Sequence, residues 1–158
     1  MSEATDYARR FAAIFDGNPR KYGIYHLDAP KTDDRGKTTG SAQTIHDDVL
    51  PEHYAAHLAG NPIEPADDVS SLGILPLIPT GKTGRCSFAV IDIDVYGEGF
   101  DVLLDRHLPK IRQLYADGRA VVPAESKSGA LHLYIFGLGV TTGAGTLKLL
   151  EALRDHFG

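Results

Sequence analysis

The segment FAVIDIDVY, residues 88–96, constrains the fold of this chain most strongly. Five of its first six residues are apolar, which is typical of a strand that is buried on both faces. Asp92 and Asp94 interrupt this run two residues apart. Because side chains alternate along a strand, this spacing predicts that both carboxylates lie on the same side. Two unpaired carboxylates on a buried strand repel each other and lose hydration, so something is expected to neutralise them.

Two interpretations of this aspartate pair follow from the residues alone. A divalent cation such as Mg²⁺ is commonly bound by one or two carboxylates together with substrate phosphates. The alternative is that Asp92 and Asp94 simply accept hydrogen bonds from backbone N–H groups of the next loop. The pattern is short, and it leaves both interpretations open.

Length and composition limit the class of protein. A chain of 158 residues predicts one domain over residues 1–158, and 42% hydrophobic and 23% charged residues are typical of a globular protein. No apolar run reaches the roughly 18–20 residues of a membrane span, and the N-terminus lacks a signal-peptide core. We therefore expect a cytoplasmic protein without a membrane partner. Its one cysteine, Cys86, excludes an internal disulfide and a cysteine-rich zinc site. The net charge of −5 argues against a general basic surface for nucleic acid.

Apolar periodicity and turn residues predict an α+β fold. The predicted helices cover 5–15, 47–59, 100–115 and 144–157, and the predicted strands cover 22–27, 72–78, 88–96, 119–125 and 131–136. Pro109 is expected to kink the third helix or to start a second segment. The core-facing stripe of the last helix is predicted to comprise Leu147, Leu150, Leu153, Arg154 and Phe157. This order favours a mixed or antiparallel sheet with helices on one face.

Two polar groups in the first half of the chain each allow two interpretations. Residues 31–40 are predicted to form an exposed loop whose charges keep it solvated or contact a nucleic-acid template; these charges include Lys31, Arg35 and Lys37. His53 and His57 lie four residues apart on a predicted helix, a spacing that can hold zinc. No third ligand is evident nearby, so a solvent-facing pair is the favoured interpretation.

The segment TGKTGR, residues 80–85, superficially resembles a phosphate-binding loop. That motif requires a glycine where this chain has Pro76, and a helix where this chain has the strand beginning near Phe88. A glycine turn that joins two strands as a hairpin is the better prediction. Lys82 and Arg85 remain candidates for phosphate or template contacts.

The second informative segment is ESKSGALH, residues 125–132, which is predicted to form a turn between two apolar strands. Hydroxyl groups and turn amides are suitable donors to phosphate oxygens, and a lysine and a histidine add charge and a further donor. The candidate phosphate ligands are Ser126, Lys127, Ser128, Gly129 and His132. For any one of these residues alone, a plain hairpin with a core histidine is the favoured explanation.

The two segments together resemble the archaeo-eukaryotic primase superfamily of primase-polymerases. The similarity is greatest to the primase domain of bacterial TOTE conflict systems and to CRISPR-associated primase-polymerases. The apolar strand that ends in Asp92-Ile93-Asp94 matches the first motif, and Glu125-Ser126-Lys127-Ser128-Gly129 with His132 matches the second. The resemblance extends from about Phe11 to the last helix.

The resemblance implies a fold and a set of roles. The sheet would be an RRM-like primase palm core, and the activity would be DNA replication or repair synthesis from nucleoside triphosphates. Asp92 and Asp94 would be the catalytic residues and ligands of Mg²⁺ or Mn²⁺, while Ser128 and His132 would hold the triphosphate. The implied partners are deoxyribo- or ribonucleoside triphosphates, a single-stranded or primed DNA or RNA template, and other domains of a longer system.

One departure from the family concerns its third acidic motif, which lies on a later strand. After His132 the chain offers Glu151 and Asp155, and both fall on a predicted helix. We therefore expect the segment to belong to a longer protein that supplies the third ligand. Two alternatives remain: a catalytically incomplete module that binds nucleotide or nucleic acid in a defence or repair protein, and a metal-dependent nuclease or phosphoesterase.

Overall fold

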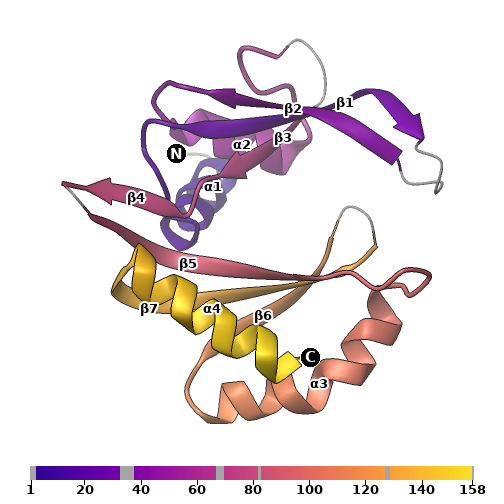
Figure 1. The fold of residues 1–158 in the computed structure, drawn as a ribbon. Coiled ribbons are helices and arrows are strands. Elements are labelled where there is room, and N and C mark those ends of the chain that lie inside the picture. Colours follow the sequence, from indigo (N-terminus) through magenta and orange to yellow (C-terminus); the bar gives the residue numbers. More distant parts are fainter. Residues whose placement is uncertain (1–2, 33–37, 67–69, 82, 127–128, 158) are drawn as a thin grey trace. The chain divides into compact units, whose positions relative to one another are not determined.

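The computed structural model describes residues 3–32, 38–66, 70–81, 83–126 and 129–157. It is an α+β fold, as predicted, and Figure 1 shows its helices and strands. The helices are α1 (Glu3–Ile14), α2 (Pro51–Ala59), α3 (Phe100–Ala116) and α4 (Gly143–Phe157). The strands are β1 (Tyr22–Thr32), β2 (Thr38–Ile45), β3 (Ser70–Ile74), β4 (Leu77–Thr80), β5 (Thr83–Ile93), β6 (Ala120–Glu125) and β7 (Leu131–Thr142).

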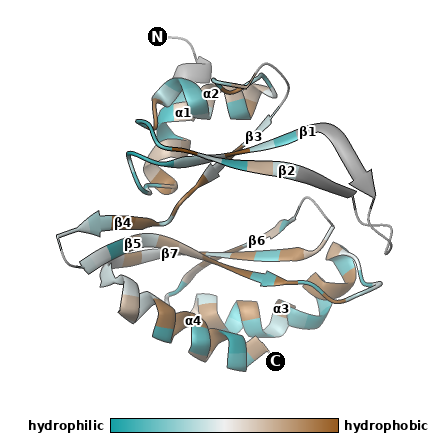
Figure 2. Cartoon of the chain, turned by 45° about the horizontal axis from the view of Figure 1, so that its top comes forward, coloured by the Kyte–Doolittle hydropathy of each residue, from teal (hydrophilic) through white to brown (hydrophobic). Residues whose placement is uncertain are grey.

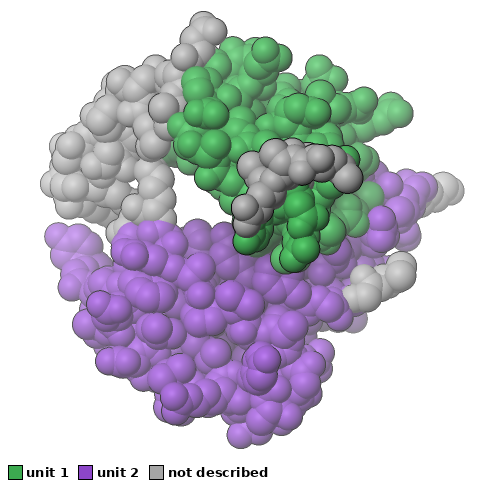
Figure 3. Space-filling view, turned by 180° about the vertical axis from the view of Figure 1, so that it is seen from behind, with its two compact units in different colours: residues 1–78 green, residues 79–158 purple. Residues whose placement is uncertain are grey.

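The chain divides into two compact units, residues 1–78 and residues 79–158, which Figure 3 colours separately. The first unit contains the three-stranded sheet β2–β1–β3, and the second contains most of the four-stranded sheet β4–β5–β7–β6. The boundary between the units falls within β4. The prediction of a single domain over residues 1–158 stays a prediction.

In the second unit the elements follow one another along the chain as β5, α3, β6, β7 and α4, and the strand order in the sheet is β4–β5–β7–β6. Strand β7 lies between β5 and β6 and pairs antiparallel with both. This is the connectivity expected of an RRM-like core, and α3 and α4 lie on the same face of the sheet (Figure 1). Hydrophobic residues are concentrated along β5 and β7, as Figure 2 shows. The prediction of a sheet with helices on one face is therefore confirmed for this unit.

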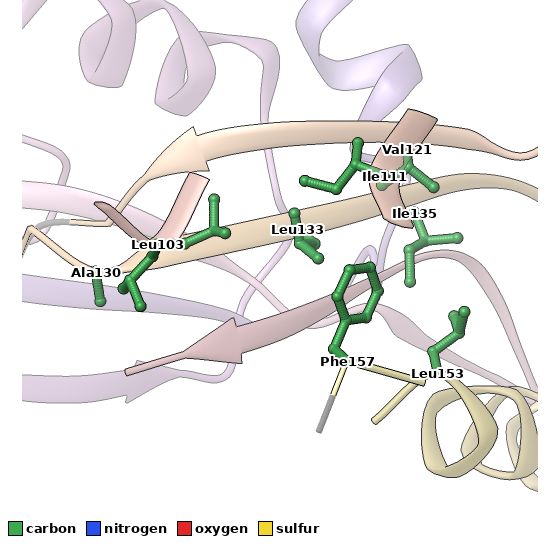
Figure 4. Packing of buried hydrophobic residues seen from close by; sticks show 9 residues of the cluster. Leu103, Ile111, Val121, Ala130, Leu133, Ile135, Leu153 and Phe157 are labelled. Atoms are coloured by element: carbon green, nitrogen blue, oxygen red, sulfur yellow. The ribbon is translucent and has the colours of Figure 1, made fainter. Parts of the chain in front are cut away.

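The core of the second unit fills the space between this sheet and its two helices. Alternate residues of β7 enter it, because positions i and i+2 of a strand share a face. Leu131, Leu133 and Ile135 are at most 2% exposed. Around them, Figure 4 shows side chains from both helices and from β6; the cluster includes Leu103, Ile111, Val121, Leu153 and Phe157. The opposite residues of β7, beginning with His132, therefore lie on the other face of the sheet.

In the first unit, α1 and α2 pack on each other, and α2 packs on β3. Tyr22 and Ile24 of β1 and Ile63 form the buried centre of this unit. Helix α2 begins with Pro51, and its end is fixed by Gly60, whose φ of 67° is the left-handed conformation that glycine adopts without strain. The predicted end of this helix at Gly60 is confirmed, whereas its N-cap is Leu50 rather than the predicted aspartates.

Several predicted boundaries differ from the structure. Strand β2 (Thr38–Ile45) was not predicted, because TTGSAQTI is polar and has no apolar alternation; it forms by pairing with β1. The predicted loop at 31–40 therefore overlaps β1 and β2, and Arg35 and Lys37 lie outside the described residues. The strand predicted at 72–78 is two strands, β3 and β4, separated at Leu75-Pro76. The hairpin turn after β4 is confirmed, with Gly81 at a φ of 60°.

The helices also show two differences in detail. Helix α3 is one continuous element that includes Pro109, so the predicted second segment is wrong. On α4, Leu147 is 57% exposed, and the buried residues are Thr146, Leu153 and Phe157. Among the described residues, no helix is both long enough and apolar enough to cross a membrane.

Candidate functional site

The structure brings together the two sequence motifs through the pairing of β5 with β7. Asp92 is the last residue but one of β5, and His132 is the second residue of β7. The register of the two strands places these residues directly opposite each other. His132 Nε2 lies 3.4 Å from Asp92 Oδ1. A carboxylate and an imidazole, distant in sequence, therefore face the same small volume.

Asp92 is not buried, and this corrects the prediction of a strand buried on both faces. Its side chain is 62% exposed, whereas Ile91 and Ile93 pack against the core of the second unit. The end of β5 alternates between the core face and the open face, as a half-buried strand does. Asp94 follows the last residue of β5 and is also exposed. Burial therefore does not force these carboxylates to be neutralised by a cation, and the desolvation argument for a metal is wrong.

The predicted phosphate turn connects β6 to β7 at the same end of the sheet. Ser126 and Ala130 form two hydrogen bonds: the Ser126 N–H donates to the Ala130 carbonyl at 2.8 Å, and the Ala130 N–H donates to Ser126 Oγ at 2.9 Å. The Gly129 N–H donates to the Ser126 carbonyl at 2.9 Å, and Gly129 has a φ of 80°. Ser126 and Gly129 thus hold the turn together. Lys127 and Ser128 lie outside the described residues, and the role of all four in phosphate binding stays a prediction.

Arg85 lies far from this site. It pairs with Thr142 near the start of β5, whereas Asp92 pairs with His132 near the end of that strand. Seven residues of a strand span about 23 Å at a rise of roughly 3.3 Å per residue. Arg85 is therefore not a ligand of a phosphate bound at Asp92 and His132, and Lys82 lies outside the described residues.

Two aromatic residues near the motifs, Tyr134 and Tyr96, were not among the predicted site residues. Tyr134 follows His132 on the same face of β7, with their ring centroids 6.0 Å apart and their planes at 78°. Tyr96 is 86% exposed on the turn after Asp94. In that turn the Glu98 N–H donates to the Val95 carbonyl at 3.0 Å. Tyr134 lies two residues after His132, and Tyr96 lies two residues after Asp94. This spacing was the sequence signal that could have indicated the two tyrosines as site residues.

The side chains of Asp92, Asp94 and His132 are suited to bind a metal ion together with the phosphate groups of a substrate. Within the described part of the chain, no three His, Cys, Asp or Glu side chains are grouped closely enough to hold a metal ion. Mg²⁺ commonly takes one or two carboxylates and completes its shell with water and substrate phosphate. Two exposed carboxylates at the end of β5 match that kind of binding rather than a preformed metal cage.

The histidine pair of α2, His53 and His57, is not solvent-facing, so that prediction is wrong. His53 is 9% exposed, and its Nδ1 accepts a hydrogen bond from the Leu50 N–H at 3.2 Å. His57 Nδ1 accepts one from the Leu72 N–H at 3.4 Å. Burial lowers the pKa of both imidazoles from the ordinary value of 6.5. Both are structural groups that act in the neutral form.

We expect the stability of the first unit to decrease as the pH falls below about 6.5. The folded His57 has a lowered pKa and binds fewer protons than the unfolded one, so acid favours the unfolded state. His57→Gln keeps an acceptor for the Leu72 N–H and does not titrate, so its loss of stability on acidification should be smaller. Urea denaturation at about pH 7.5 and 5.5 measures this, with the exposed His46→Gln as control. Equal losses in His57→Gln and in the unmodified chain would contradict the assignment.

Neither the models of known protein families nor the curated proteins match this chain.

Proposed function

We propose that this chain is the catalytic domain of a cytoplasmic primase-polymerase of the archaeo-eukaryotic primase superfamily. The reaction is the transfer of nucleotides from nucleoside triphosphates to a 3′-hydroxyl, directed by a DNA or RNA template. The observation that carries this proposal is the pairing of Asp92 with His132, because it joins the acidic motif to the Ser/His motif. The RRM-like strand order β5–β7–β6 supports it at the level of the fold.

In this proposal each side chain has a distinct task. Asp92 and Asp94 supply the negative charge that holds Mg²⁺ or Mn²⁺, which when bound neutralises the triphosphate and activates the 3′-hydroxyl. His132 donates a hydrogen bond from Nε2 to a phosphate oxygen, and its position opposite Asp92 orients the triphosphate toward the carboxylates. The turn from Ser126 to Ala130 fixes the start of β7, and so the place of His132, by its paired hydrogen bonds.

The test is incorporation of a labelled nucleotide on a primed single-stranded template in the presence of Mn²⁺. Asp92→Asn and Asp94→Asn are each expected to lower incorporation by about 100-fold or more, as loss of a preorganised charged group in an active site does. Asp105→Asn, which changes an exposed carboxylate on α3, is the control and should retain activity. Undiminished incorporation by Asp92→Asn would refute the proposal.

A second candidate is a module that binds a nucleoside triphosphate or a nucleic-acid end without transferring nucleotides. The observation that favours it is that the carboxylates that follow His132 in the chain lie on a helix, whereas the third acidic motif of the family lies on a strand. Glu151 and Asp155 lie on α4, and Asp155 forms an ion pair with Arg154 at 2.8 Å. Triphosphate binding that depends on Asp92, without any incorporation, would select this candidate.

A further inference from the structure

The loop that carries Asp94 connects β5 to α3 over residues 94–99 (Figure 1). Its two ends are held by the core, because Ile93 before it and Phe100 after it pack against the buried cluster of the second unit. Between these ends the loop turns at Gly97, which has a φ of 80°. A loop anchored at its ends alone moves more freely than the elements that it connects. The place of Asp94 therefore depends on what else holds the loop.

Glu98 ties this loop to the helix that follows it. Its Oε1 accepts a hydrogen bond from Arg106 Nη2 at 2.6 Å, and the two side chains form an ion pair. The backbone of the same residue closes the turn after Asp94, since the Glu98 N–H donates to the Val95 carbonyl at 3.0 Å. One residue thus joins the turn to a side chain that lies eight positions further along the chain.

Arg106 is carried by a helix that the core holds in place. On α3, Leu103 lies three residues before it and is 0% exposed, within the buried cluster of the second unit. The Leu103 N–H donates to the Gly99 carbonyl at 3.1 Å, so the first turn of the helix begins at the last residue of the loop. Arg106 therefore links the loop to a fixed element.

The second oxygen of Glu98 makes this link more important than that of a fully exposed ion pair, which contributes little. Glu98 Oε2 is buried, and no described group donates a hydrogen bond to it. The side chain as a whole is 27% exposed. Without Arg106 this carboxylate has to regain hydration, because a buried charge without a partner is strongly unfavourable. The loop is then expected to open toward water, which displaces Asp94.

We propose that Arg106 is a positioning residue for Asp94. Acting through Glu98, it fixes the loop 94–99 and so keeps the Asp94 carboxylate in place to bind a metal ion together with Asp92. In this role Arg106 contacts neither the metal nor the nucleotide. The inference rests on the proposed function, and it adds a residue of α3 to the groups on which that function depends.

Hydrogen exchange of the metal-free chain tests the structural half of the proposal. In Arg106→Gln the amides of residues 94–99 should exchange at least about tenfold faster than in the unmodified chain, because the loop opens locally. Exchange in residues 131–136 of β7 should not change. Arg112→Gln, which alters another exposed arginine of α3, is the control and should leave both segments unchanged. Unchanged exchange of the loop, or faster exchange of both segments, would overturn the proposal.

The Mn²⁺ dependence of nucleotide incorporation tests the functional half. A displaced Asp94 binds the metal more weakly, so Arg106→Gln should require about tenfold more Mn²⁺ for half-maximal incorporation, and excess Mn²⁺ should restore part of the activity. A side chain that only stabilised the fold would not respond to Mn²⁺ in this way. Arg106→Lys keeps a cation for Glu98 and should fall between Arg106→Gln and the unmodified chain.

A double-mutant cycle tests whether Arg106 acts through Glu98. The double variant Arg106→Gln/Glu98→Gln should require no more than about twice the Mn²⁺ of Arg106→Gln alone, because the two side chains act as a pair. Multiplied effects would overturn the proposal. So would a Glu98→Gln variant much more impaired than Arg106→Gln, since Glu98 would then bind the metal itself.

Asp92→Asn separates this inference from the proposed function. If incorporation is lost in Asp92→Asn and Arg106→Gln has the Mn²⁺ requirement of the unmodified chain, the positioning role alone is refuted. If Asp92→Asn retains full incorporation, the proposed function is refuted and the positioning role with it.

Discussion

Replacing Leu133 by alanine is expected to destabilise the second unit by about 2–5 kcal/mol. Leu133 is 0% exposed and lies on β7, the strand between β5 and β6, so its removal leaves a cavity that neither neighbouring strand can fill without moving. Urea denaturation followed by circular dichroism measures the free energy of unfolding.

Leu147→Ala is the matched control for this prediction. It makes the same chemical change on α4, at a side chain that is 57% exposed, and is expected to alter stability by about 0.5 kcal/mol or less. Equal losses of stability in the two variants would contradict the assignment of β7 to the core.

Replacing His132 by alanine is expected to weaken binding of a nucleoside triphosphate by about 10- to 100-fold. In the proposed site its Nε2 donates to a phosphate oxygen, and a hydrogen bond to a charged group is worth about 1.5–3 kcal/mol. His132 is 29% exposed, so the substitution leaves the core of the unit intact. Titration of a fluorescent triphosphate in the presence of Mn²⁺ measures the affinity.

The control for this prediction is His156→Ala, which removes an exposed imidazole from the end of α4. It should bind the triphosphate as the unmodified chain does. A His132→Ala variant with unchanged affinity would show that this histidine has no part in triphosphate binding.

The sequence predicted the second unit well because its elements are apolar and strongly periodic. Five apolar residues before Asp94 indicated β5, and the leucines of α3 indicated a helix that covers the sheet. The turn residues at Gly81 and Gly129 separated strands that do pair as hairpins. The position of β7 between β5 and β6 is what places His132 opposite Asp92, and the pairing order was not predictable from the local pattern.

The sequence failed where tertiary contacts outweigh local pattern. Strand β2 is polar, and its pairing with β1 cannot be anticipated from its own residues. His53 and His57 look like surface residues four positions apart, yet both accept backbone N–H groups in a partly buried setting. Asp92 looked buried because the residues around it are apolar, whereas alternation along β5 exposes it. In each case the local sequence does not show which face of the strand or helix a neighbouring element covers.

The measurement that tests the central claim most directly is calorimetric binding of a nucleoside triphosphate, with and without Mn²⁺, to the unmodified chain and to Asp92→Asn. The proposal predicts binding that requires Mn²⁺ in the unmodified chain and is lost in Asp92→Asn, while the Asp105→Asn control binds normally. Binding that is indifferent to Mn²⁺ and to Asp92, or the absence of any binding, would contradict a triphosphate site at Asp92 and His132.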